Sequence, residues 1–481
     1  MKKIGLLLAL LMVTSLTFQS CEDMDDNAVP VNDFIWKGLN LYYLWQEQVP
    51  ELDDDRFGNQ AQLNTYLEGF SSPESLFQNL LYEPGTTDRF SVLFPDYRVL
   101  ENALQGVSTS NGVEFGLVYT DESQTSIFGY VRYILPNSDA STKDIQRGDI
   151  FYAINGTPLN ESNYQALLSE NSYTLNLADY VDGQIVPNGE EVALIKTEYA
   201  ENPVYTTNVV TEDEHVIGYF MYNGFFSNYD EELNAAFGQL AGQGVNELVL
   251  DLRYNSGGSV QTATYLASMI TGQFNGELFS KEQWNSKLQE YYESSNPGVL
   301  VNNFTDKLSN GAAINSLNLN RVYILTTRST ASASELIINC LKPYIDVVVI
   351  GDVTTGKNVG SVTLYDSRDF SRNDRSGVHT YAMQPIVLKI VNKNNFGDYE
   401  QGINPNIEIR EDFGNLGMIG NPNEPLFAAA IADITGNGRF TLYTDDTHKL
   451  IKDSKSIRRF GTEMYVDDVP EGGFNLIKNL Q

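Results

Sequence analysis

The chain has 481 residues, enough for two or three domains and at least one large hydrophobic core. Apolar residues make up 42 % of it, which is ordinary for folded proteins and excludes a largely disordered chain. Asp and Glu number 63 against 31 Lys and Arg, and the resulting formal charge of −32 repels phosphate backbones. A general nucleic-acid binder is therefore excluded.

The first twenty residues have the pattern of a secretion signal. Lys2 and Lys3 precede an apolar run that ends just before Cys21, which resembles a bacterial lipoprotein signal. The resemblance implies that residues 1–20 are a signal peptide, that Cys21 is lipidated and that residues 21–31 form a tether. It also implies the bacterial cell envelope, lipid-anchored at the outer membrane, with the acidic run EDMDD resembling a surface-exposure signal. A plain secretory signal with an incidental cysteine is the alternative. Membrane contact is expected only through the lipid anchor, because no other segment is long and apolar enough to span a bilayer.

Residues 32–105 have a helical pattern. The apolar residues of FIWKGLNLYYLW recur at helical spacing, and SPESLFQNLLY opens with residues typical of a helix start. We expect a small N-terminal helical domain whose aromatic residues belong to its core rather than to a binding surface.

Short strands broken by turn residues dominate residues 106–200. The segment LPNSDASTKDIQRGDIFYAING predicts a short helix, a turn, a strand and an Asn-Gly turn, and this order resembles a PDZ domain. In a PDZ domain a peptide adds as a strand beside a glycine-containing loop. The resemblance places that loop in NGVEFGL, where the expected peptide-binding residues are Gly112, Phe115, Gly116 and Leu117.

Residues 203–435 alternate short apolar strands with helical segments. ELVLDLR, RVYILTT and DVVVIGD are apolar on both faces, which indicates a largely parallel sheet covered by helices. Residues 274–318 are polar and irregular and are expected to be an insertion over the sheet edge. Cys340 falls on the apolar face of a helix, where we expect a buried free thiol. Residues 436–481 are a charged C-terminal tail without an assigned role.

Two strand-to-helix junctions carry residues suited to catalysis. One strand ends at the glycine pair of DLRYNSGG, Gly257 and Gly258, and another ends before a helix that starts near Ser332. Reacting groups in open α/β sheets lie outside the carboxyl ends of strands, and a helix N-terminus supplies unpaired amides. Ser329 and Ser334 are interpreted as helix caps, which leaves Ser332 to project its hydroxyl into a crevice.

A serine nucleophile needs a base. The three histidines, His215, His379 and His448, do not lie in a motif typical of a Ser-His-Asp site. Lys357 follows another apolar strand inside a glycine loop. It can act as a base only if burial lowers its pKa by about 3 units, roughly 4 kcal/mol. Taken alone, such a lysine is interpreted as a solvated surface residue.

The motifs STASASE, TTGK and DLRYNSGG together resemble the C-terminal processing (tail-specific) serine peptidases. The resemblance covers about residues 30–435. It implies a PDZ domain before a catalytic core, and therefore a multidomain α/β protein with an N-terminal helical domain, a PDZ-like β-rich domain and a crotonase/ClpP-like α/β core.

The resemblance also assigns roles to residues. Ser332 becomes the nucleophile and Lys357 the general base, with the buried, uncharged amine within hydrogen-bonding reach of the serine hydroxyl. The amides of Ala333 and of the Gly257–Gly258 turn become the oxyanion hole. The family often has a glutamine four residues after the lysine, and Ser361 stands there in this chain, where we expect it to orient the amine over a shorter reach.

The expected function is a serine endopeptidase that uses a Ser-Lys dyad on extended polypeptides, especially their C-terminal segments, with no metal and no organic cofactor. The alternatives are a catalytically inactive peptide- or ligand-binding surface lipoprotein on the same fold, and hydrolysis with His215 or His379 as the base.

Overall fold

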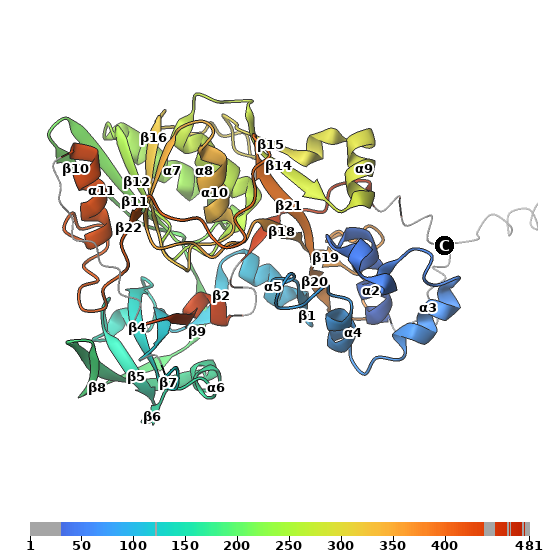
Figure 1. Cartoon of the computed structure of the whole chain (residues 1–481), viewed down its shortest axis with the longest axis horizontal. Coiled ribbons are helices and arrows are strands. Elements are labelled where there is room, and N and C mark those ends of the chain that lie inside the picture. Colours follow the sequence, from blue (N-terminus) through green and yellow to red (C-terminus); the bar gives the residue numbers. More distant parts are fainter. Residues whose placement is uncertain are drawn as a thin grey trace, which may run out of the picture.

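The computed structural model describes residues 30–120, 123–436, 448–458, 461, 463–473 and 476. These residues form a helical N-terminal region, a β-rich domain and a larger α/β core, which adjoin one another (Figure 1). The predicted fold class, a multidomain α/β protein, is confirmed. The expected signal peptide and Cys21 lie outside the described residues, and the last two residues of the expected tether already belong to the first described helix.

The N-terminal region is helical and is fixed to the core. It contains α2 (Pro30–Tyr42), α3 (Gln60–Leu67), α4 (Pro73–Asn79) and α5 (Tyr97–Leu104). Helix α4 begins at its sequence signal, because Ser72 and Ser75 cap each other and a proline occupies the first turn. The aromatic residues of α2 are buried in the same apolar cluster as the core helices. Strand β1 (Val92–Phe94) pairs antiparallel with β20 (Ala382–Gln384) of the core.

The β-rich domain is built around one antiparallel sheet with its own apolar core. Its strands from the middle of the chain are β3 (Val113–Tyr119), β4 (Ile127–Ile134), β5 (Ile150–Ile154), β6 (Thr157–Pro158), β7 (Ser172–Val181) and β8 (Gln184–Ile195), with α6 (Tyr164–Ser169). The strand order is β23-β3-β4-β5-β7-β8, so the outer edge of β3 is covered by β23 (Leu450–Asp453) from the C-terminal part of the chain. A two-stranded ribbon of β2 (Val107–Ser110) and β9 (Thr197–Ala200) leads into and out of the domain.

The core contains a six-stranded sheet in the order β10-β11-β12-β16-β17-β22. β10, at one edge, pairs antiparallel with β11, and the other neighbouring strands pair in parallel. The strands are β10 (Val204–Glu212), β11 (His215–Tyr222), β12 (Glu247–Asp251), β16 (Arg321–Thr326), β17 (Asp346–Gly351) and β22 (Ile407–Glu408). The sheet side chains alternate between two apolar clusters, one on each face.

Helices cover both faces of this sheet, as the apolar strands predict. One face carries α7 (Asp230–Gly242), α8 (Val260–Thr271) and α10 (Ala333–Leu341), and the other carries α11 (Pro425–Thr435) (Figure 1). Cys340 is a buried free thiol on α10, as predicted. Because β12, β16 and β17 are parallel neighbours, their carboxyl ends lie at one edge of the sheet.

A second six-stranded sheet has the order β13-β24-β18-β21-β14-β15. Its strands are β13 (Gly258–Ser259), β24 (Met464–Val466), β18 (Val359–Val362), β21 (Ile386–Asn392), β14 (Leu278–Trp284) and β15 (Val301–Asn303). The prediction that residues 274–318 form an irregular insertion is wrong, because β14, α9 (Ser286–Ser295) and β15 are regular elements. Their polar residues concealed the pattern: Ser280 and Glu282 are buried despite being polar.

The interpretation of residues 436–481 as a separate tail is also wrong for the residues described there. β23 belongs to the sheet of the β-rich domain, β24 belongs to the second sheet of the core, and α12 (Ser454–Ile457) lies between them in the sequence. Within the described ranges, none of the helices combines the length and hydropathy that a bilayer crossing requires.

Candidate active site

Two loops meet where the sequence predicts a crevice, at the carboxyl ends of β12 and β16. The loop after β12 carries Asn255, whose carbonyl oxygen accepts hydrogen bonds from the Ala331 amide and the Ser334 hydroxyl, both at 3.1 Å. The Thr330 hydroxyl donates to the Leu252 carbonyl at 2.9 Å. The serine loop is therefore bound directly to the glycine turn.

Ser332 adopts a strained backbone conformation at the start of α10. Its φ is 64° and its ψ is −118°, a combination that costs an L-residue about 1–3 kcal/mol and persists only where the surroundings impose it. The side chain is fully buried, and its Oγ forms no hydrogen bond with any described residue. The hydroxyl is therefore presented at a helix N-terminus without being used as a cap.

Glu335 ties the serine loop to the lysine loop. Its Oε2 accepts from the amides of Ser332 and Lys357, both at 2.8 Å, and its Oε1 accepts from the Gly356 amide at 2.7 Å and the Thr354 hydroxyl at 2.5 Å. Burial raises the pKa of this carboxyl, and the four donors oppose the rise. One side chain thus sets the separation of the two loops.

Lys357 is fully buried, as the predicted base requires. Its Nζ lies 4.5 Å from the centre of the Phe90 ring and 2.8 Å from Glu463 Oε2. Burial lowers the pKa of the Lys357 ammonium, and the Glu463 carboxylate opposes that change. Burial also raises the pKa of Glu463, so both groups shift toward their neutral forms.

The predicted Ser332–Lys357 hydrogen bond is absent from this structure. Ser332 Oγ has no described partner, while the Lys357 amine bonds to Glu463. Ser361 does not take the place of the family's glutamine either, because its hydroxyl donates to the Met464 carbonyl at 3.3 Å. The C-terminal part of the chain therefore provides the contacts that the prediction assigned to Ser332 and Ser361.

The glycine turn lies against Ser332. Gly257 has a φ of 110°, and a Cβ there would lie 2.5 Å from Ser332 Cβ and 2.3 Å from the Glu463 carbonyl oxygen. Only glycine permits this close approach. The Gly257 amide donates to Asn255 Oδ1 at 2.9 Å, so it is not available to an oxyanion as predicted.

Two other residues beside Ser332 are candidates for that role. Gly258, the second residue of the glycine turn, pairs with Met464 of β24 in this structure, so its amide could serve an oxyanion only in the absence of that strand. Ala333 is the first residue of α10, and the amides of a first helical turn have no partner within the helix. Gly258 and Ala333 are the oxyanion-hole candidates that the geometry retains.

The interpretation of Ser329 and Ser334 as helix caps is wrong. The Ser334 hydroxyl bonds back to Asn255, and Ser329 accepts a hydrogen bond from Arg132 at 2.9 Å. The capping position belongs to Ser332, and Glu335 satisfies its amide instead of a serine hydroxyl. The strained turn at Ser332 directs the neighbouring serines away from the helix end.

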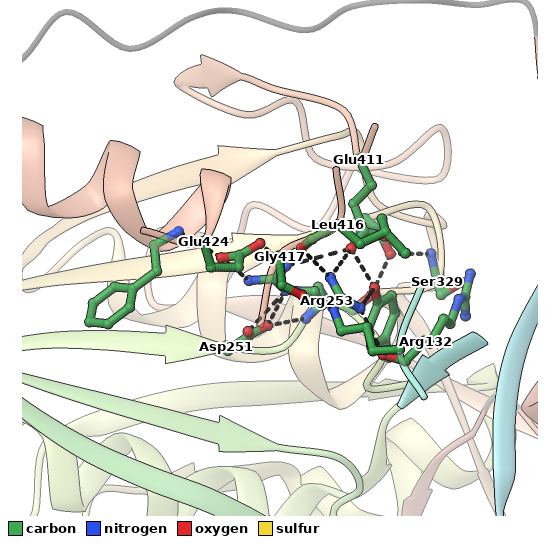
Figure 2. A network of polar contacts seen from close by, with 12 residues as sticks. Arg132, Asp251, Arg253, Ser329, Glu411, Leu416, Gly417 and Glu424 are labelled. Carbon is green, nitrogen blue, oxygen red and sulfur yellow. Dashed lines mark hydrogen bonds and ion pairs between the residues drawn. The ribbon is translucent and has the colours of Figure 1, made fainter. Parts of the chain in front are cut away.

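Arg132 connects the β-rich domain to the serine loop. This buried residue of β4 donates to Ser329 Oγ, which lies in the same loop as Ser332 (Figure 2). It also pairs with Asp453 at 2.9 Å. Burial alone would raise the pKa of Asp453, yet the guanidinium and further donors lower it to about 2. The loop is therefore supported from a second domain.

Two further buried arginines extend this contact. Arg253, at the end of β12, is held by Asp251 at 2.9 Å and by Glu424 at 2.6 Å (Figure 2). Arg147, the arginine of the RGD turn, pairs with Glu411 at 2.9 Å. Each guanidinium has a carboxylate partner, which offsets the cost of burying the charge.

The predicted peptide-binding residues lie along an edge that is already paired. Phe115 and Leu117 are buried in the β-rich domain, and Leu117 and Gly116 stand opposite Lys452 and Asp453 of β23. A Cβ on Gly112 would lie 1.8 Å from Ser138 Oγ, so this loop is tightly packed.

The histidines considered as alternative bases lie elsewhere. His215 begins β11, at the opposite end of the sheet from Ser332, and contacts Glu247 at 3.6 Å. His379 pairs with Asp366 at 3.0 Å beside the N-terminal helices. The structure provides no histidine beside Ser332 among the described residues.

An unusual serine on a strand-to-helix turn, a buried lysine and a glycine turn on an α/β core together define a site of the serine-hydrolase type. Residues 216–409 match peptidase family S41, and residues 30–92 match the peptidase S41 N-terminal domain. The chain belongs to peptidase family S41.

Curated relatives are similar over part of their length. The "Probable CtpA-like serine protease" of Staphylococcus epidermidis is 25% identical over 193 residues, 38% of this chain and 36% of the relative. The "Carboxyl-terminal-processing protease" of Picosynechococcus sp. is 25% identical over 229 residues, 47% of this chain and 50% of the relative. The chain thus spans about a third to a half of the length of these relatives.

The likeness to a solved structure is more extensive. An S41 protease candidate from Bacteroides fragilis is 25% identical, and the match covers 84% of this chain and 98% of that one with a TM-score of 0.65. The match includes most of the described chain, so the structural similarity extends beyond the α/β core.

Sequence reasoning missed three residues of the site. Glu335 had a usable signal, because a serine followed three residues later by glutamate is the capping-box pattern. Asn255 lies inside a quoted motif but received no role. Glu463 had no local signal, since it stands 106 positions after Lys357 in a charged segment.

Proposed function

We propose that the chain is a serine endopeptidase of the C-terminal processing type, with Ser332 as nucleophile and Lys357 as general base. The observation that carries the proposal is the fully buried lysine amine, held in a loop that Glu335 binds to the strained Ser332 turn. Burial lowers the pKa of the Lys357 ammonium, which favours the neutral amine that a general base requires, although the Glu463 carboxylate opposes this change.

In the proposed reaction the Ser332 Oγ attacks the carbonyl carbon of a peptide bond while its proton passes to Lys357 Nζ. The negative charge on the carbonyl oxygen is stabilised by the amides of Ala333 and Gly258. The C–N bond then breaks, and the proton on Nζ passes to the leaving amine. Water hydrolyses the resulting ester with Lys357 again as base, which restores the serine.

The step requires a rearrangement from the structure described here. Lys357 must leave Glu463 and reach Ser332 Oγ, because an amine bonded to Glu463 Oε2 at 2.8 Å is not in position to take the proton of the serine hydroxyl. The backbone amides of Ser332 and Lys357 are both bound to Glu335, so the two loops can stay in place while the Lys357 side chain moves.

Fluorophosphonate labelling with mass mapping tests the assignment. Wild-type protein should be labelled on Ser332, and Ser332→Ala should abolish labelling. Lys357→Met should slow labelling and casein hydrolysis by about 10²–10⁴-fold, the usual contribution of a general base. Lys342→Met, at the exposed end of α10, is the matched control and should keep the wild-type rate.

Two outcomes would contradict the proposal. Labelling on a different serine would remove the role of Ser332, and full activity of Lys357→Met would remove the lysine mechanism. Absence of labelling and hydrolysis in every form would favour the alternative of an inactive peptide- or ligand-binding lipoprotein, for which the pairing of Lys357 with Glu463 is the supporting observation.

We propose further that the chain is anchored to the outer membrane through lipid on Cys21. The support is the sequence pattern alone, in which two lysines and an apolar run precede the cysteine. Metabolic labelling with an alkynyl fatty acid should mark the wild-type chain and not Cys21→Ala, and equal labelling of both would contradict the anchor.

A further inference from the structure

The C-terminal part of the chain occupies the active-site region as a β strand. In the second sheet, β24 lies between β13, which contains Gly258, and β18, which follows Lys357. The ladder pairs Gly258 with Met464 and Ser361 with Tyr465, both in parallel orientation. An extended segment thus bridges the glycine turn and the lysine loop, the position that an extended polypeptide must reach to meet Ser332.

The same segment neutralises the reacting groups. The Glu463 carboxylate holds the Lys357 amine at 2.8 Å, and the Glu463 carbonyl oxygen lies against Gly257. Ser332 has no exposed surface. With β24 in place, the hydroxyl is covered and the base is occupied.

The residues just before β24 cover the other candidate peptide site. β23 pairs antiparallel with β3 along the edge to which the PDZ resemblance assigns a peptide strand. Ile451 and Ile457 pack against the apolar core of the β-rich domain. The two ends of the segment therefore lie on the two surfaces that a polypeptide substrate would use.

Ion pairs fix this segment to both domains. Asp453 pairs with the buried Arg132 at 2.9 Å, and Arg458 bonds to Glu114. The Lys455 amine donates to the Asn223 carbonyl at 2.5 Å, in the loop that follows β11 of the core. These contacts of charged side chains indicate that the segment binds at a specific position and is not in chance contact with the two domains.

We propose that residues 450–458 and 463–466, here called the C-terminal strap, are an intramolecular competitor of polypeptide substrates. The strap fills the strand positions beside β3 and between β13 and β18, and substrate gains access to Ser332 only when β24 leaves. The inference deepens the proposed peptidase function and rests on it for the identity of the competing ligand.

β24 is the part of the strap that has to move, because it lies between the glycine turn and the lysine loop beside Ser332. Each ladder of β24 contains only two residue pairs, Gly258 with Met464 and Ser259 with Tyr465 on one side, and two pairs with β18 on the other. Met464 of β24 is buried in the main apolar cluster, while the earlier part of the strap pairs with buried Arg132 and packs into the core of the β-rich domain. Release of β24 alone frees both Lys357 and the Ser332 turn.

A reversible crosslink in the full chain tests the strap. Val362 and Val466 are direct partners in the β18–β24 ladder, a spacing compatible with a disulfide. In the double variant Val362→Cys with Val466→Cys, oxidation should slow fluorophosphonate labelling of Ser332 at least tenfold, and reduction should restore it. The single variant Val466→Cys is the control and should not respond to redox conditions.

A second measurement does not depend on catalysis. In Glu463→Gln, amide hydrogen exchange of residues 463–466 should become at least tenfold faster than in wild type, because the charged contact to Lys357 is lost. The matched control is Glu471→Gln, which changes an exposed glutamate a few residues after the strap. In this variant residues 463–466 should exchange as in wild type.

The outcomes separate the two proposals. Equal labelling of Ser332 in the oxidised and reduced double variant would refute the proposal that the strap competes with substrate. Unchanged amide hydrogen exchange in Glu463→Gln would also refute it. Faster exchange in Glu463→Gln, with no labelling of Ser332 in any form of the protein, would support the binding position of the strap. It would refute the proposed peptidase function. Redox-controlled labelling together with faster exchange would support both.

Discussion

Replacing Glu335 by glutamine should uncouple the serine loop from the lysine loop. The carboxylate accepts four hydrogen bonds, two on each oxygen, from three backbone amides and one hydroxyl. A glutamine oxygen placed at the Oε2 site keeps the amides of Ser332 and Lys357. Its NH₂ group then faces the Gly356 amide, and two donors cannot bond to each other.

The cost follows from these contacts. One buried amide loses its acceptor and two hydrogen bonds lose their charge assistance, for which about 2–4 kcal/mol is the expected sum. For a folding unit of about 200 residues, such a loss lowers the thermal midpoint by about 5–10 °C. A displacement of about 1 Å between nucleophile and base can cost 10²-fold in rate, so labelling of Ser332 should fall by about 100-fold even well below the midpoint.

Differential scanning calorimetry and fluorophosphonate labelling of the same preparations provide the assay. Glu290→Gln is the control, because Glu290 is exposed on α9 and should shift neither measurement appreciably. A Glu335→Gln variant with the wild-type thermal midpoint and labelling rate would refute the idea that this carboxylate holds the two loops in register.

Three further substitutions probe other parts of the structure. Gly257→Ala places a methyl group 2.5 Å from Ser332 Cβ at a φ of 110°, so labelling should fall by about 100-fold; wild-type labelling would contradict the close approach. Ser334→Ala removes one neutral hydrogen bond to Asn255 and should cost about 1 kcal/mol in calorimetry with less than threefold change in labelling; loss of labelling would instead make Ser334 the nucleophile. Burial raises the pKa of Glu282 to about 7 from 4.5, so the folded state favours its protonated form and loses up to about 3 kcal/mol of stability as the pH rises through that range. Glu282→Gln should remove this slope from the pH dependence of thermal unfolding, and an unchanged slope would show that Glu282 does not cause it.

Local sequence patterns predicted the core because they report local structure. The strands before the glycine turn and before Ser332 are apolar on both faces, and each is followed by a helix, which indicates a parallel sheet without further information. The loops after these two strands begin at the same edge of the sheet, because the carboxyl ends of parallel strands lie together. The burial of Lys357 was predicted only because a lysine that acts as a general base needs a lowered pKa. The neighbouring residues in the sequence do not indicate it.

Contacts between distant segments account for the errors. Glu463 and Arg132 reach the site from a charged C-terminal segment and from another domain, and neither lies in a motif. Ser329 and Ser334 satisfied the rule for helix caps, yet the rule presumes ordinary backbone geometry before the helix. At Ser332 the φ of 64° breaks that premise, and the neighbouring hydroxyls turn toward other partners.

The backbone geometry at Ser332 has a consequence for how this protein can change. A glycine there adopts a φ of 64° without steric cost, so Ser332→Gly should give a more heat-resistant but inert chain, whereas a β-branched threonine would be disfavoured although it also carries a hydroxyl. Selection for robustness alone would therefore drive this position away from reactivity. Under the proposed peptidase function, the strained turn is kept because the reaction requires the serine hydroxyl and not because it stabilises the fold.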